Sequence, residues 1–255
     1  MTKPSSSQET YDLSLLDQSL EKWNASTGLQ AVYHSIFDDM LRQSEGSDLL
    51  ELGSGAGFFK QYDSRVTTSD VRKTPFVDLS VSAYEVHSLP QKWDTIFAMD
   101  MLHHLTRPFA FFESAAQALK SGGKIILAEP AATLGGRSFY RAFHHEPCNP
   151  SELKHPFVFT SDENGEFANM GMSEALFVHH RSEADAALNR FGLKVESQIY
   201  RDLAAYPLTG GLSQSQLAPT KLIKALLSIE SVLPQSFLRL FALRVIIVIK
   251  KHPNP

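Results

Sequence analysis

Apolar residues near the start of the chain recur at three- and four-residue intervals, over residues 13–23 and again over residues 29–41. This is the period of an α-helix with one apolar face, so two amphipathic helices are expected. Shorter apolar runs follow, separated by turn residues and helical stretches, which predicts strands that alternate with helices. The runs expected as strands are 49–52, 65–71, 76–86, 93–99, 124–129, 193–200 and 244–250. The order predicts an α/β fold.

Two segments of the second half differ in their patterns. Residues 131–172 show little periodicity, whereas residues 221–243 form an amphipathic stretch broken at Pro234. Earlier in the chain, a helix is expected over residues 106–119, ended by the Ser-Gly-Gly sequence at 121–123.

A glycine-rich turn follows the first expected strand. Gly53, Gly55 and Gly57 stand at alternate positions directly before Phe58, where a helix is expected. Glycine lets a ligand approach the backbone closely, and the next helix offers unpaired N–H groups to an anion. A dinucleotide site would read G-x-G-x-x-G, and Phe58 occupies the position of its third glycine. A tight turn without any ligand is the structural alternative.

An acid lies at the end of the second expected strand. Asp70 follows Gly57 by 13 residues. A carboxylate at this place can accept hydrogen bonds from both ribose hydroxyls of a nucleoside, although Asp is also a common turn residue. The spacing favours a nucleoside-binding role for Asp70.

Size and charge exclude several classes of protein. The chain has 255 residues, of which 43% are hydrophobic and 20% charged, as in an ordinary globular protein. A formal net charge of -4 argues against a nucleic-acid partner. A single cysteine, Cys148, excludes an internal disulfide framework, and no secretory signal is visible, so a cytoplasmic location is expected.

The C-terminal segment is more basic than the rest. Residues 216–255 carry six Lys or Arg side chains and one acid, Glu230. Because the cations accompany apolar residues in an amphipathic pattern, weak peripheral contact with an anionic membrane is one expectation. A helix pair folded over the sheet is the alternative, and it is favoured because the core also needs these apolar faces.

Four segments within residues 48–130 resemble the motifs of one family. They are E-x-G-x-G-x-G at 51–57, an E-V-H-S-L-P sequence at 85–90, L-H-H-L at 102–105, and L-K-S-G-G with a later E-P at 119–130. In this order they resemble class I S-adenosylmethionine-dependent methyltransferases, in particular those that modify lipids, quinones and small metabolites.

The resemblance implies a fold and a cofactor. We expect one domain over residues 1–255, with a Rossmann-like, seven-stranded, mostly parallel sheet whose last strand is antiparallel and which helices flank. Helices within 11–45 would lie over the cofactor core at 48–130, and inserted cap segments at 131–172 and 203–243 would form the substrate side. S-adenosyl-L-methionine is the implied cofactor. The implied cofactor-binding residues are Glu51, Gly53, Ser54, Gly55, Gly57, Asp70, Glu85, Val86 and Asp100.

Some of these assignments have rivals. Glu85 and Val86 would contact the adenine, but Asp78 and Ser82 are alternative anchors for it. In the leading helices, Trp23 could face the pocket or simply pack on the sheet, and packing is favoured. The same choice applies to Tyr33 and His34.

Two residues at the exit of the fourth strand are the catalytic candidates. Asp100 and His103 would reach the carboxyl edge of the sheet, where open α/β proteins bind ligands. Imidazole titrates near neutral pH, so His103 is the candidate general base for an oxygen or nitrogen acceptor. Alternatively, His103 and His104 anchor the following helix. His144 and His145, or no protein base at all, complete the alternatives.

No metal is expected. The sequence His144-His145-Glu146-Pro147-Cys148 contains ligand types, but adjacent histidines rarely converge on one ion, and no second spaced pair accompanies them. A structured loop beside the substrate is the favoured interpretation.

The predicted function is therefore in-line transfer of a methyl group from S-adenosyl-L-methionine to a small-molecule, lipid or saccharide-type acceptor. A non-catalytic S-adenosylmethionine-binding or partner protein is one alternative. Another Rossmann-fold enzyme, such as a nicotinamide oxidoreductase, is the second. The acceptor, the methylated atom and the oligomeric state stay open.

Overall fold

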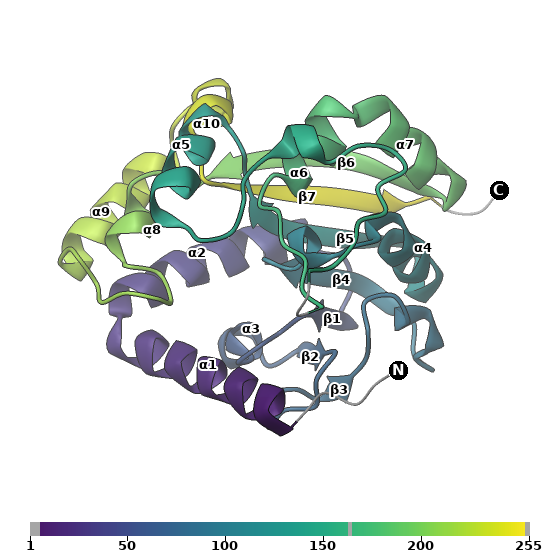
Figure 1. The fold of residues 1–255 in the computed structure, drawn as a ribbon, viewed down its shortest axis with the longest axis horizontal. Coiled ribbons are helices and arrows are strands. Elements are labelled where there is room, and N and C mark those ends of the chain that lie inside the picture. The colour runs from purple at the N-terminus through teal and green to yellow at the C-terminus, as the bar shows by residue number, and fades with distance from the viewer. Residues whose placement is uncertain (1–5, 163–164, 253–255) are drawn as a thin grey trace.

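A computed structural model describes residues 6–162 and 165–252 (Figure 1). Its strands are β1 (Leu49–Leu52), β2 (Val66–Asp70), β3 (Leu79–Ser80), β4 (Trp93–Met99), β5 (Leu119–Pro130), β6 (Leu193–Arg201) and β7 (Arg244–Lys251). Its α-helices are α1 (Ser6–Ala25), α2 (Thr27–Gln43), α3 (Phe58–Tyr62), α4 (Pro108–Ala118), α5 (Leu134–Phe143), α6 (Met172–Glu174), α7 (Arg181–Arg190), α8 (Ala205–Leu208), α9 (Thr220–Glu230) and α10 (Gln235–Phe241). Short helical turns are η1 (Val86–Ser88), η2 (Leu102–His104), η3 (Pro150–Glu152) and η4 (Ala175–His179).

The seven strands form one sheet in the order β3-β2-β1-β4-β5-β7-β6. Strand β7 pairs antiparallel with both β5 and β6, and the other pairings are parallel. From β1 the chain adds β2 and β3 on one side of the sheet and then β4 and β5 on the other. Ligands bind at such a switch point, here between β1 and β4, in open α/β sheets. The predicted Rossmann-like architecture with an antiparallel last strand is confirmed.

Alternate side chains of the strands build two apolar layers. Leu50, Ile96 and Leu127 point to the face covered by α4, η4, α7 and α10, whereas Phe97 and Ile126 point to the face covered by α2, α3 and α9. Figure 1 shows α4 and α7 at the right of the sheet, α2 and α9 at the left, and α10 at the upper left. Because both faces are covered, the central strands β1, β4 and β7 and the second half of β5 are mainly apolar, as the short apolar runs predicted.

Helix α2 is the principal cover of the second face. Its buried side chains repeat at helical spacing, among them Leu29, Val32, Ile36, Phe37 and Met40. The Ser26 hydroxyl caps the helix by accepting a hydrogen bond from the backbone of Leu29 at 3.1 Å. The helix end is therefore fixed by a local cap, and its direction by burial of one face.

Several boundaries differ from the expectations. The 121–123 sequence does not end a helix but lies within β5, since α4 ends at Ala118. The strand expected over 76–86 is reduced to the two residues of β3, at the edge of the sheet. Helix α5 occupies part of 131–172, where no helix was expected. Among the helices that the structure describes, none has the length and apolar character needed to cross a membrane.

Candidate active site

The glycine turn after β1 has the backbone conformation that its sequence requires. Gly53, Gly55 and Gly57 have φ angles of 69°, 51° and 69°, in the left-handed region. A Cβ on Gly57 would lie 2.8 Å from the carbonyl oxygen of Phe76, so glycine is needed there for space as well. A Cβ on Gly55 would meet nothing closer than Leu16 Cδ2 of α1, at 3.7 Å. The middle of the turn therefore has room beside it.

A buried carboxylate lies directly before this turn. Glu51 is 5% exposed, and within the described part of the chain its Oε2 atom has no hydrogen-bond partner. Burial raises the pKa of Glu51 to about 7, against a smaller lowering by Ser54. An unsatisfied buried acid is costly unless a ligand completes its contacts, and a cationic group suits it.

Asp70 at the end of β2 contacts the same turn. Its Oδ2 accepts a hydrogen bond from the backbone N–H of Gly55 at 3.3 Å, and its Oδ1 accepts one from the backbone N–H of Arg72 at 3.1 Å. The Ser54 N–H donates to Ser69 O at 2.9 Å, which holds the turn against β2. The structure thus brings together the glycine turn, Ser54 and Asp70.

The predicted adenine contacts, Glu85 and Val86, lie at η1 and not in the glycine turn itself. Glu85 is exposed at the start of η1, and the side chain of Val86 lies in the core, so Val86 offers a ligand only its backbone. Of the rival anchors, Asp78 accepts hydrogen bonds from the Thr68 N–H at 2.9 Å and hydroxyl at 3.0 Å. Asp78 is therefore occupied in joining β2 to β3.

The exit of β4 places Asp100 at the sheet edge. Its φ of 50° is left-handed, which costs an ordinary residue energy but is tolerated best by Asp and Asn. Its carboxylate pairs with the guanidinium of Arg244, a buried residue at the start of β7 that also contacts Asp202 Oδ2 at 3.3 Å. Asp100 is thus fixed by a buried cation from the neighbouring part of the sheet.

Glu129, at the end of β5, orders the turn that follows. Its Oε1 accepts hydrogen bonds from the backbone N–H groups of Met101 at 2.9 Å and Leu102 at 2.8 Å. Its Oε2 lies 2.8 Å from His103 Nδ1. One carboxylate therefore sets both the start of η2 and the orientation of the His103 ring.

His103 lies between two carboxylates. The side chain is buried, and its Nε2 is 3.6 Å from Glu146 Oε2. Burial lowers the pKa of His103, but Glu129 and Glu146 outweigh burial and raise it to about 10. A protonated imidazole has no free lone pair with which to accept a proton. These contacts therefore favour a positively charged His103. That His103 acts as a general base stays a prediction.

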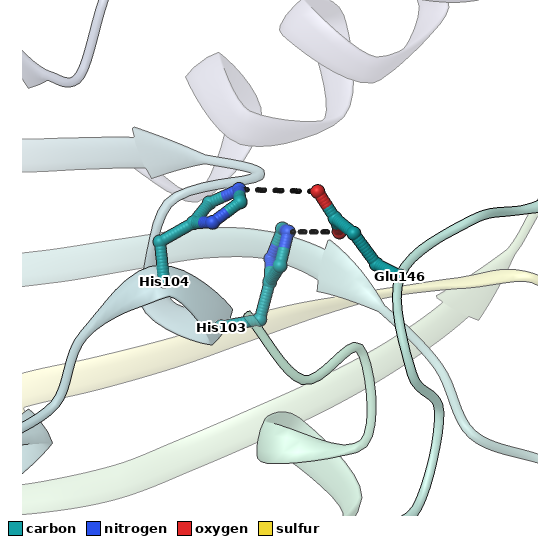
Figure 2. Close-up of side chains that lie close together, drawn as sticks. All are labelled: His103, His104 and Glu146. Carbon is teal, nitrogen blue, oxygen red and sulfur yellow. Dashed lines mark ion pairs between the residues drawn. The ribbon is translucent and has the colours of Figure 1, made fainter. Parts of the chain in front are cut away.

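His104 and Glu146 complete a cluster with His103 (Figure 2). His104 Nδ1 is 3.3 Å from the carbonyl oxygen of Phe167, and its Nε2 is 4.0 Å from Glu146 Oε1. Glu146 comes from the loop after α5, and the close-up shows its carboxylate facing both rings. The cluster joins η2 to the first inserted segment.

A cavity of about 580 Å³ opens over this cluster. Its walls are mainly apolar and aromatic and come from both inserted segments and from α2. The lining residues include Tyr33, Phe139, Tyr140, Phe143, Met170, Tyr206, Leu208, Leu212 and Leu217, with Asp100, His103, His104, His144, Glu146, Ser213, Gln214 and Arg244 as polar groups. This size is typical of small-molecule sites.

The glycine turn does not itself line the cavity, but it packs against a residue next to the cavity lining. A Cβ on Gly53 would lie 3.0 Å from Met101 Cγ, and Met101 directly follows Asp100 of the cavity lining. Of the helix residues that could face the pocket, Tyr33 lines the cavity. Trp23 instead stacks on Phe58 with ring centroids 4.3 Å apart.

Sequence analysis missed several of these residues as site residues. Glu129 was part of a motif without a role, and Arg244 was noted only as a charge of the basic tail. Glu146 was visible as a ligand type but was grouped with its sequence neighbours His144 and His145. The only available signal was position, since Glu129 and Arg244 mark the ends of paired strands at the same edge.

Comparison with known proteins agrees with the fold. A SAM-dependent methyltransferase from Archaeoglobus fulgidus has a TM-score of 0.52 and 13% sequence identity, covering 87% of this chain and 94% of that chain. The N-methyltransferase NodS from Bradyrhizobium japonicum, solved with S-adenosyl-l-homocysteine, has a TM-score of 0.43 and 12% identity, covering 86% of this chain and 87% of that chain. No curated protein matches the chain in sequence. The methyltransferase domain family matches residues 18–198, well over half of the sequence. The chain therefore belongs to the methyltransferase domain family.

Proposed function

We propose that this enzyme transfers the methyl group of S-adenosyl-L-methionine to a small acceptor with an apolar or aromatic body. The cofactor supplies a methyl group activated on a sulfonium. Glu51, the glycine turn and Asp70 would hold it, because they combine an open backbone cradle with two carboxylates beside it. The cationic groups of S-adenosylmethionine suit the unsatisfied oxygen of Glu51.

The observation that carries the acceptor class is the cavity beside the glycine turn. Aromatic and aliphatic side chains form most of its wall. One group of polar side chains, around Asp100 and His103, lies at the edge of the sheet, and we call it the base of the cavity. Such a surface favours burial of an apolar body over binding of a saccharide, which needs many polar partners. An acceptor would place its nucleophilic atom toward the polar base.

The side chains of the base would position the acceptor more than remove its proton. His103 has carboxylates near both ring nitrogens, and Asp100 is paired with Arg244. In methyl transfer the leaving group is already good, so alignment is the main demand on the protein. An acidic acceptor that arrives deprotonated needs no protein base.

Mass spectrometry tests the proposal directly. The purified enzyme would be incubated with methyl-labelled S-adenosylmethionine and sets of hydroxylated aromatic compounds, long-chain lipids and sugars. Labelled product is expected from an apolar set. Labelled sugars without any apolar product would contradict the acceptor class, and cofactor binding without any product would favour a non-catalytic partner protein.

A pair of variants locates the acceptor. Leu217 lines the cavity and is largely exposed, so Leu217→Trp narrows the mouth without disturbing the core. We expect a higher KM for the acceptor and unchanged affinity for S-adenosylhomocysteine. Leu222, exposed on α9, does not line the cavity, and Leu222→Trp is the matched control. Equal KM values for both variants would place the acceptor elsewhere.

A further inference from the structure

Three ligating side chains converge at the base of the cavity. His103, His104 and Glu146 each place one ligand atom so that all three lie within 4.8 Å of one another. Two of these residues are neighbours in sequence, but they stand on the short turn η2, where their ring centroids are 4.1 Å apart. Figure 2 shows the carboxylate of Glu146 facing both rings.

Each histidine has its other ring nitrogen tied to an acceptor. His103 Nδ1 is 2.8 Å from the Glu129 carboxylate, and His104 Nδ1 is 3.3 Å from the Phe167 carbonyl. Since neither oxygen can donate, both Nδ1 atoms carry the proton, and in the neutral rings both Nε2 atoms offer a lone pair. A histidine oriented in this way by a carboxylate or carbonyl is the usual form of a metal ligand.

Glu146 supplies the third and unsatisfied group. Its Oε2 is buried, and within the described residues it has no hydrogen-bond partner. His103 Nε2, at 3.6 Å, is too far for a hydrogen bond, as is His104 Nε2 at 4.0 Å from Oε1. These separations are longer than hydrogen bonds, so the three groups leave space for a small ion between them.

We propose that His103, His104 and Glu146 bind a divalent transition-metal ion such as Zn²⁺, Mn²⁺ or Fe²⁺. Ligands about 2.1 Å from a tetrahedral ion are about 3.4 Å apart. The two histidine–glutamate separations, 3.6 and 4.0 Å, are close to this value. Because all the ligand atoms lie within 4.8 Å of one another, the widest pair needs a contraction of at most about 1.4 Å. Two imidazoles and one carboxylate are a recurrent ligand set for these ions and leave coordination positions open. All three residues line the cavity, so the open positions face the acceptor.

The site would act on an oxygen of the acceptor, and this role rests on the proposed function. An ion there would bind a hydroxyl or carboxylate oxygen, orient it, and lower the pKa of a hydroxyl so that its proton is released to water. The ion would thus promote the proton release that His103, held between two carboxylates, is poorly placed to perform. An acceptor with an oxygen at the end of an apolar body fits this arrangement.

A proton is the competing occupant. Without an ion, a proton on His103 Nε2 places positive charge between Glu129 and Glu146. An ion would replace that proton, so both interpretations predict a cation here. Metal binding distinguishes them.

Calorimetry on the full chain without cofactor or acceptor tests the site. After dialysis against a chelator, Zn²⁺ and Mn²⁺ would be titrated at pH 8, and Co²⁺ would be followed by visible absorption. We expect stoichiometric binding of at least one of these ions, weakened about tenfold or more in Glu146→Gln and His104→Ala. Both changed side chains lie at a turn or loop, and thermal unfolding checks that the variants fold.

His145→Ala is the matched control. The His145 side chain is 87% exposed and adjoins Glu146 in sequence. Its removal should leave affinity unchanged. Absence of stoichiometric binding in the wild-type protein, equal affinity in Glu146→Gln, or loss only in His145→Ala would each overturn the proposal. Because this assay contains no methyl donor, metal binding without methyl transfer would leave the site intact and reject only the proposed function.

Discussion

Glu51 gives a prediction in which stability and cofactor binding change in opposite directions. The carboxyl group is buried, and its pKa is raised from an ordinary value of 4.5 to about 7. The folded state therefore holds a proton that the unfolded chain releases at lower pH. Ionised Glu51 destabilises the fold, and this cost is absent below about pH 4.5 and grows until the pH exceeds about 7.

The size of the effect follows from this gap in pKa. At about 1.4 kcal/mol per pH unit, it corresponds to about 3 kcal/mol at pH 8 and to less than about 1 kcal/mol at pH 5. Glu51→Gln keeps the shape of the protonated acid and has no charge to bury. We therefore expect the free energy of unfolding of the variant to exceed that of the wild type by up to about 3 kcal/mol at pH 8, with little difference at pH 5.

The same change should weaken cofactor binding, because the variant lacks a carboxylate for the cationic part of the ligand. We expect about tenfold lower affinity for S-adenosylhomocysteine at pH 8. Urea unfolding at both pH values and calorimetry provide the measurements. Glu113→Gln is the control, because Glu113 is an exposed acid on α4 and its change should alter stability by less than about 0.5 kcal/mol.

Two results would refute this reasoning. A Glu51→Gln protein that is no more stable than the wild type at pH 8 would mean that ionised Glu51 is satisfied in the folded protein. Unchanged affinity for S-adenosylhomocysteine would remove Glu51 from the cofactor site.

Three other predictions concern the cofactor loop and the surface. Asp70→Ala should weaken S-adenosylhomocysteine binding by about ten- to a hundredfold in calorimetry, whereas Asp70→Asn, which keeps an acceptor for Gly55, should recover part of it; unchanged affinity in the alanine variant would remove Asp70 from the site. Gly57→Ala should lower the free energy of unfolding by about 2 kcal/mol or more, because a Cβ there meets both a left-handed φ and the Phe76 carbonyl. Gly55→Ala should lower it by about 1 kcal/mol, because its φ is left-handed but the space around a Cβ is open. Equal losses in the two variants would contradict the steric argument. If the exposed apolar side chains and cations of α9 and α10 contact an anionic membrane, the protein should sediment with anionic but not neutral vesicles; equal recovery with both would end the membrane hypothesis.

The part of the fold that sequence predicts best is the part encoded by local periodicity. The apolar runs at β1 and β4 and the apolar face of α2 depend on neighbours within a few residues, so their patterns are visible in the chain. The glycine turn was visible for the same reason, since its positive φ angles exclude most other residues.

Glycines used for close packing caused two of the errors. Gly122 and Gly123 were interpreted as a helix stop, but a Cβ on Gly123 would lie 2.8 Å from Asp94 O, so this glycine permits the approach of β4. Gly136 lies within α5, where a Cβ would be 1.9 Å from Ala131 O. Its low helix propensity hid this helix, and tertiary packing outweighed that propensity.

The base of the cavity was beyond sequence reasoning for a different reason. His103 and Glu146 meet through the path of the loop after α5, and Arg244 reaches Asp100 through the pairing of β5 with β7. No local pattern records such contacts. The order of residues therefore predicted the ligand types but not which of them converge.

The direction of β7 has a practical consequence for handling the enzyme. Because β7 runs antiparallel to β5, its first residue, Arg244, pairs with Pro130 at the cavity edge, and Lys250 pairs with Lys124 at the far edge. Figure 1 shows this end of β7 at the right of the sheet, away from α5 and α8. At the other terminus, Leu16 of α1 lies close to the glycine turn. A tether for surface capture or a fluorescent fusion therefore belongs after β7, where it leaves the cavity mouth open, rather than before α1.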